Sequence, residues 1–154
     1  MGRDIHCVIQ KNMKGVWTTV LKDIIPGRDL TLFDFICSRF RHRGFPKDFK
    51  VVLKGGDPWH EDIWMGESGF GWCTLDDFVT QELPETPLTE ACSIEQHKRR
   101  VYITIDEAED PYYNVRCLQK SFRILFGDSH VCHTPQGTSR EGLLCYRLVF
   151  GFDY

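Results

Sequence analysis

The chain has 154 residues, a formal net charge of −3 and a hydrophobic fraction of 42%. A chain of this length can bury roughly two-thirds of its surface, so we expect one globular domain over residues 1–154 and exclude intrinsic disorder. The negative net charge argues against nucleic acid as a partner, because non-specific binding to nucleic acid needs a positive field.

The seven cysteines are odd in number and contain no C-x-x-C pair. A disulfide framework would favour an even number, and a zinc ribbon would favour paired cysteines. The sequence shows neither a secretory signal pattern nor an apolar run long enough to cross a membrane. These patterns predict mostly free thiols, a cytoplasmic protein and no contact with a membrane.

Residues 4–11, DIHCVIQK, alternate in a pattern that predicts a β-strand. Their side chains divide between two faces, an apolar one with Ile5, Cys7 and Ile9, and a second one with Asp4, His6, Val8 and Gln10. A turn at Gly15, followed by the β-rich residues 16–22, predicts a hairpin partner for this strand.

Two capping patterns predict helices in the first half of the chain. Asp29 can cap a helix that runs to about Arg39, with apolar residues at helical spacing. Thr74, followed three residues later by Asp77, has the pattern of a capping box and predicts a second helix. Between them, residues 41–73 lack periodicity and hold three of the four tryptophans, which predicts a long Trp-rich central loop.

In the second half, residues 100–106 are typical of a short strand, and an apolar stripe from Tyr112 to Leu125, ended by Gly127, predicts a third helix. The closing segment LLCYRLVFGFDY is apolar at both alternating sets of positions, as in a strand that is buried on both faces. We therefore expect it to pair with the N-terminal strand inside a sheet. The predicted fold class is α+β, a single mixed β-sheet with about three helices packed against it.

Four segments carry a resemblance to known proteins: MGRDIH at the start, RDLTLFDFI followed by RGFPKDF, WMGESGFGWCTLDDF in the middle, and YRLVFGFDY at the end. In this order they resemble the landmarks of a family of uncharacterised bacteriophage and prophage proteins, and they cover about a third of the chain. Family members have a histidine and serines before the tryptophan of the central block, where this chain has ESGFG. The resemblance implies a phage origin, and hence the host cytosol, but no particular chemistry.

Asp4 and His6 lie two residues apart on the predicted strand, so their side chains project from one face about 7 Å apart. A histidine beside a carboxylate can carry a proton, contact an anion or bind a metal. If the terminal strands are adjacent, Arg147 or Asp153 can approach this pair. The alternative is a half-buried histidine that only satisfies the backbone of the sheet.

The predicted central loop holds a second set of candidates, made up of Trp59, His60, Trp64, Ser68 and Trp72. Aromatic rings beside polar groups suit a flat polar ligand, because the rings stack on it and the polar groups orient it. The alternative is that the tryptophans fill the core.

His130, Cys132 and His133 are competent metal ligands. A structural zinc site, however, usually draws two ligands from each of two segments, and no second pair is visible. An ordinary turn after a helix is the simpler interpretation of DSHVCH, so the predicted site contains no metal and no cofactor.

These patterns favour a phage-type accessory protein that binds a small polar host ligand, with nucleotide-type signals of antiviral defence as one class. The first alternative is a small metal-independent hydrolase or phosphodiesterase, with His6 and His60 as acid and base and Arg147 or Lys54 stabilising negative charge. The second alternative is an adaptor that binds a host protein through exposed tryptophans and tyrosines.

Overall fold

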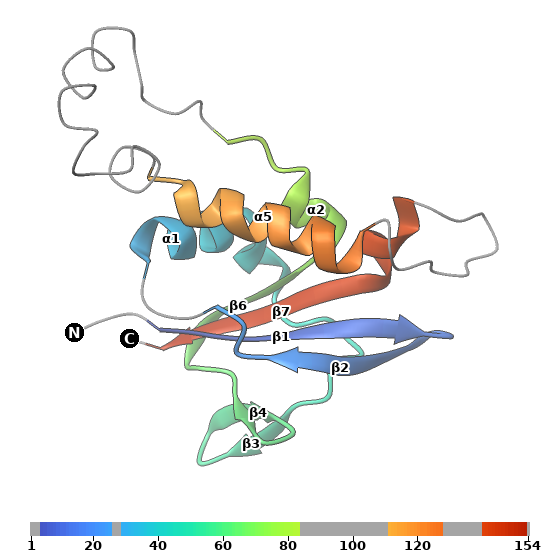
Figure 1. Ribbon diagram of the computed structural model, residues 1–154. Helices are drawn as coiled ribbons and strands as arrows, with labels where there is room; N and C mark the ends of the chain where they lie inside the picture. Colours follow the sequence, from blue (N-terminus) through green and yellow to red (C-terminus); the bar gives the residue numbers. More distant parts are fainter. Residues whose placement is uncertain (1–3, 26–28, 84–110, 128–139, 154) are drawn as a thin grey trace, which may run out of the picture.

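The computed structural model describes residues 4–25, 29–83, 111–127 and 140–153, and Figure 1 shows their arrangement. Four strands form the main sheet in the order β2-β1-β7-β6. Their bounds are Asp4–Met13 for β1, Val16–Lys22 for β2, Ser68–Thr74 for β6 and Tyr146–Asp153 for β7. The predicted hairpin and the pairing of the two terminal strands are confirmed. The predicted mixed sheet is wrong, because every strand pair in the described residues is antiparallel.

Strand β7 lies in the centre of the main sheet, between β1 and β6. Seven of its eight residues are buried, as its continuous apolar sequence predicts. Successive side chains of a strand point to opposite faces. Phe150 and Phe152 therefore enter one hydrophobic core, whereas Val149 enters a second core on the other face.

The α-helices of the described residues pack on one face of the main sheet, as Figure 1 shows. They are α1 (Leu30–Phe40), α2 (Leu75–Val79) and α5 (Tyr113–Phe126), with short 3-10 helices η1 (Arg41–Arg43) and η2 (Arg140–Cys145). Asp29 caps α1 by accepting a hydrogen bond from the Leu32 backbone at 3.1 Å. Thr74 and Asp77 form the predicted capping box of α2. Both predicted N-terminal caps are confirmed.

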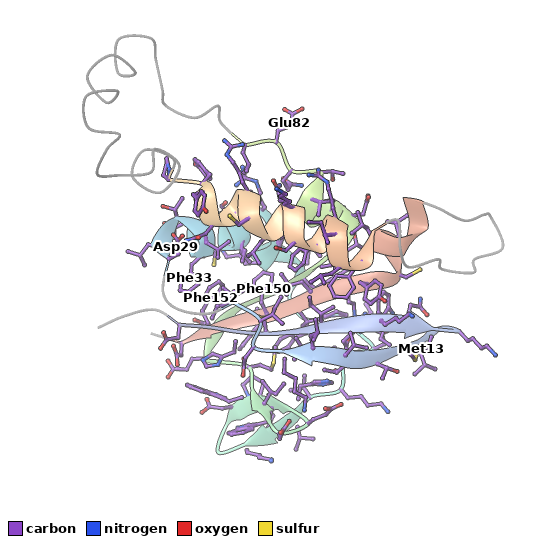
Figure 2. All side chains as sticks on the ribbon, viewed as in Figure 1. Met13, Asp29, Phe33, Glu82, Phe150 and Phe152 are labelled. Atoms are coloured by element: carbon purple, nitrogen blue, oxygen red, sulfur yellow. The ribbon has the colours of Figure 1, made fainter. Side chains whose placement is uncertain are left out.

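The main core lies between this helical layer and the sheet, and aromatic side chains dominate it. Figure 2 shows Phe33, Phe150 and Phe152 in this layer, and the rings of Phe33 and Phe152 meet edge to face at 5.6 Å. The predicted apolar stripe of α5 is wrong at its end. Leu125 is 53% exposed, whereas Phe126, the next residue on the helix, is buried.

A second sheet occupies the middle of the segment that the sequence predicts to be a loop. Its three antiparallel strands are β3 (Val52–Lys54), β4 (Asp57–His60) and β5 (Ile63–Trp64). Gly55 and Gly56 form the β3–β4 turn with positive φ angles of 62° and 88°. The predicted long loop is wrong, because strands of two to four residues are too short to show a hydrophobic period. This small sheet lies below the main sheet in Figure 1, on the side away from the helices.

The described residues include five cysteines, of which Cys7, Cys37, Cys73 and Cys117 are free. Cys145 is disulfide-bonded, and the four free cysteines agree with the prediction of mostly free thiols. Burial raises the pKa of the Cys7 thiol to about 12 and also raises the pKa of Cys73. The described helices include none that is long and apolar enough to cross a membrane. The predicted strand at 100–106 lies outside the described residues.

Candidate functional site

The face of the main sheet that lies away from the helices carries the polar side chains of β1. Alternation on β1 places Asp4, His6, Val8 and Gln10 on this face, as predicted, and their Cα partners on β7 are Asp153, Gly151, Val149 and Arg147. The middle of the face is apolar, with a small core of Val8, Phe49, Ile63, Met65 and Val149 beneath the small sheet. Polar groups therefore gather at two places, one on each side of this small core.

His6 and Asp153 form the first polar group. The His6 Nε2 atom lies 3.2 Å from Asp153 Oδ2, and the two side chains are 21% and 19% exposed. A carboxylate only accepts hydrogen bonds, so Nε2 carries the proton of this contact, and whenever the imidazole is neutral Nδ1 is an acceptor. The other carboxylate oxygen of Asp153 accepts a hydrogen bond from the Asp4 backbone N–H at 3.1 Å. Asp153 is thus held by β1 and in turn orients the imidazole of His6.

Trp64, the last residue of β5, lies beside this pair. Its ring centroid is 4.9 Å from that of His6, with the two planes inclined at 47°. Within the described residues, the hydrogen bonds, ion pairs and ring contacts of His6 involve Asp153 and Trp64 only. The partly exposed His6 therefore keeps Nδ1 available for another group.

Two glycines allow the segment after Trp64 to cross β7 at close range. A Cβ atom on Gly151 would lie 1.9 Å from the Met65 backbone oxygen, so no larger residue fits there. Gly66 has a φ of 88°, and a Cβ atom on it would lie 2.5 Å from the Phe152 backbone oxygen. This contact between backbones holds the indole beside the imidazole.

Arg147 belongs to the second polar group, on the other side of the small core. Its Nε donates to Gln10 Oε1 at 2.9 Å and its Nη1 donates to Asp48 Oδ1 at 2.8 Å, while the guanidinium lies 4.3 Å from the ring centroid of Trp17. Burial lowers the pKa of Arg147, and the ion pair with Asp48 opposes this shift. The structure does not bring Arg147 to His6. The Cα partner of Arg147 is Gln10, which lies four residues beyond His6 on β1.

His60 is buried at 4% exposure and has partners on both ring nitrogens. Nδ1 lies 2.7 Å from the Lys50 backbone oxygen, and Nε2 lies 2.7 Å from Thr19 Oγ1. The ring also stacks on Phe49 at 4.3 Å. His60 therefore fastens the small sheet to β2, and it cannot exchange a proton with a ligand unless one of these bonds breaks.

The remaining predicted site residues lie around the small sheet and β6. Trp59 is the Cα partner of Trp64 and lies under the Lys54 ammonium, whose Nζ is 5.0 Å from its ring centroid. Trp72 lies under the Arg43 guanidinium at 5.3 Å. Both tryptophans are half-buried and keep surface in contact with solvent. Trp72 also packs against the small core.

Ser68 begins β6 and is the Cα partner of Phe152, the residue before Asp153. The metal-ligand candidates His130, Cys132 and His133 lie outside the described residues. Within the part of the chain that the structure describes, no group of three or more metal-ligating side chains gathers.

An open groove of about 380 Å³ lies on the helical side of the molecule. Side chains of α1, together with Pro111 and Tyr112, line it. None of the residues that the sequence marks as site candidates lines this groove, so the cluster at His6 and the groove are separate features.

Comparisons with protein-family models, with curated proteins and with solved structures find no match to this chain.

The sequence patterns did not identify three residues that bind the predicted site residues across distant segments. Gln10 and Asp48 form hydrogen bonds with Arg147, and Thr19 forms one with His60. Only the alternation of β1, which places Gln10 on the same face as His6, pointed to one of them.

Proposed function

We propose that the protein is a phage-type accessory protein that binds a small polar host ligand, of nucleotide type, at a cluster of Asp4, His6, Trp64 and Asp153. His6 meets the ligand through Nδ1, and Asp153 keeps the imidazole oriented for this contact. Trp64 offers a partly exposed indole to a planar group, since aromatic faces hold bases and sugars by stacking.

The observation that carries this proposal is the convergence of three distant landmarks of the sequence. MGRDIH contributes His6, WMG contributes Trp64 and Gly66, and FGFDY contributes Gly151 and Asp153. The apolar residues on the helical face of β1 already specify the register of this strand. The polar pair at the end of the sheet is therefore not needed for strand pairing, which supports a role in binding.

The test is a thermal-shift screen of nucleotides and cyclic nucleotides, followed by calorimetry on each compound that raises the melting temperature. We expect His6→Ala to abolish binding. His42→Ala is the matched control, because His42 is exposed and lies in η1, away from the cluster. A ligand that binds wild type and His6→Ala equally would show that the site lies elsewhere.

Ile5→Ala provides the opposite control from the neighbouring residue. Ile5 points into the main core, so its truncation should cost about 2–5 kcal/mol of unfolding free energy while the folded fraction still binds the ligand. His6→Ala should cost little stability, because its side chain is partly exposed. If His6→Ala unfolds the protein and the surviving fraction binds normally, the histidine is structural.

A hydrolase or phosphodiesterase is the second candidate, and the orientation of His6 by Asp153 favours it. A histidine held by a carboxylate through one nitrogen can accept a proton at the other. His60 cannot act as its partner, because both of its ring nitrogens are occupied. Chromatography of the ligand after incubation separates the two functions, because a binder returns it intact and an enzyme returns a product.

A further inference from the structure

The chain carries a concentrated positive segment, although its net charge is negative. Residues 39–54, RFRHRGFPKDFKVVLK, contain six Lys and Arg residues and one acidic residue, whereas the whole chain has 19 basic and 22 acidic residues. The segment thus has a net charge of +5, and the rest of the chain has −8. The net charge of the whole chain therefore does not reveal this positive segment.

The structure leaves the positive charge of this segment at the surface. Five of its basic residues are exposed, and we call them the basic band: Arg41, Arg43, Lys47, Lys50 and Lys54. Asp48, the single acidic residue, is paired with the buried Arg147 and does not neutralise the basic band. Asp77 pairs with one member, Arg43, at 2.9 Å.

The basic band follows one continuous path along the side of the molecule. Its first part lies against β6, because a Cβ atom on Gly71 would be 2.8 Å from the Arg41 Cα atom. Its last member, Lys54, ends β3 in the small sheet. Figure 1 shows the chain passing from the helical layer, beside the main sheet, to the small sheet along this path.

Aromatic rings lie along the same path. Arg43 covers Trp72 at 5.3 Å, and Lys54 covers Trp59 at 5.0 Å, measured to the ring centroids. Phe45, from the segment between these cations, packs on Phe70 of β6 at 4.5 Å. All four rings are half-buried, so each keeps part of its surface exposed.

We propose that the basic band and its aromatic rings form a binding surface for single-stranded nucleic acid. Exposed cations that follow one stretch of the chain suit the phosphates of a single strand, and the exposed parts of the rings beside them suit unstacked bases. A duplex would use the cations but not the rings, because its bases are stacked inside. An acidic peptide would likewise leave the aromatic faces unused.

The test is fluorescence anisotropy with a labelled oligothymidine and an oligouridine of about twenty nucleotides, from low salt upward. Up to five phosphate contacts predict a salt slope no steeper than about −3.5, since each contact on a single strand contributes about −0.7. Tryptophan fluorescence should be quenched as bases stack. No binding of either oligonucleotide at about 50 mM salt would overturn the proposal.

The decisive variant is the double substitution Arg41→Gln and Lys47→Gln. Neither side chain makes a hydrogen bond or ion pair with the described residues, so the fold should be unaffected. The loss of two contacts should weaken binding about ten-fold or more at low salt and reduce the salt slope by about 1.4. The matched control is Lys14→Gln with Lys120→Gln, which changes the net charge equally on exposed residues outside the basic band.

Equal weakening by the two double variants would overturn the proposal, because binding would then depend on net charge alone. Competition by polyglutamate as strong as that by the oligonucleotide would also overturn it, in favour of an acidic polypeptide. His6→Ala should bind the oligonucleotide as wild type does. This last measurement separates the two proposals, because either the oligonucleotide surface or the ligand site at His6 can be disproved without the other.

Discussion

The two faces of the main sheet are built differently. The helical face is closed by aromatic packing, with Phe33, Phe150 and Phe152 all completely buried. The face under the small sheet has a core of only five buried residues, flanked by the His6 pair and by the Arg147 network. The difference indicates a division of roles, in which one face buries most of the apolar side chains and the other holds oriented polar groups, partly exposed at His6 and buried at Arg147.

Truncation of the helical face should produce the largest loss of stability. Phe33→Ala removes a fully buried ring in contact with Phe152 and should cost about 3–5 kcal/mol. Chemical denaturation measures this loss. Leu53→Ala, at a residue 70% exposed on the small sheet, is the control and should have almost no effect. A similar cost for both variants would contradict the division of roles.

An added methyl group where the two backbones cross should produce the next largest effect. Gly151→Ala places a Cβ atom against the Met65 backbone oxygen, so β5 must move, at a cost of about 2–3 kcal/mol. Because Trp64 moves with β5, the free energy of ligand binding at His6 should fall by more than the free energy of unfolding does. Gly15→Ala is the control for added bulk, since a Cβ atom there meets nothing within 4 Å although the turn conformation is strained. Normal ligand affinity in Gly151→Ala would contradict this coupling.

Loss of the buried arginine should have a smaller effect. Arg147→Met leaves Gln10 Oε1 without its donor but also removes the Nη2 group that has no partner, so we expect a cost of about 1–2 kcal/mol. Adding Gln10→Leu should recover part of this loss, because the buried Oε1 acceptor is then removed together with its donor, while the exposed Asp48 carboxylate can turn to water. A double-mutant cycle with purely additive costs would show that the hydrogen bond does not couple the two residues.

The smallest effect is expected at the exposed ion pair between Lys22 and Asp62, whose Nζ and Oδ1 atoms are 2.7 Å apart. The hydrogen bond from Lys22 lowers the pKa of Asp62, so any stabilisation is present at neutral pH and lost as the pH falls through this lowered pKa. Both groups are exposed and screened by salt. Asp62→Asn should therefore leave the denaturation midpoint unchanged at physiological salt, and a clear shift would show that the pair fastens the small sheet.

Local patterns were sufficient to predict several elements and contacts. The alternation of β1, the Asp29 cap and the capping box at Thr74 depend on neighbouring residues, and all three are confirmed. The apolar character of β7 predicted its central position, and this position brought Asp153 to His6. Here a local pattern was enough because burial on both faces of a strand leaves few alternative places in a sheet.

The sequence by itself determined which residues face each side of β1, because the period of a strand is a local property. The turn at Gly15 indicated the pairing of β1 with β2, and the apolar character of β7 indicated its place inside the sheet. The small sheet, the partners of Arg147 and His60, and the place of Trp64 beside His6 were decided by tertiary structure alone. Each depends on contacts between segments far apart in the chain, such as Thr19 with His60 and Gly151 with Met65. No local period records such contacts, since they arise only when two separate backbones are brought together by the packing around them.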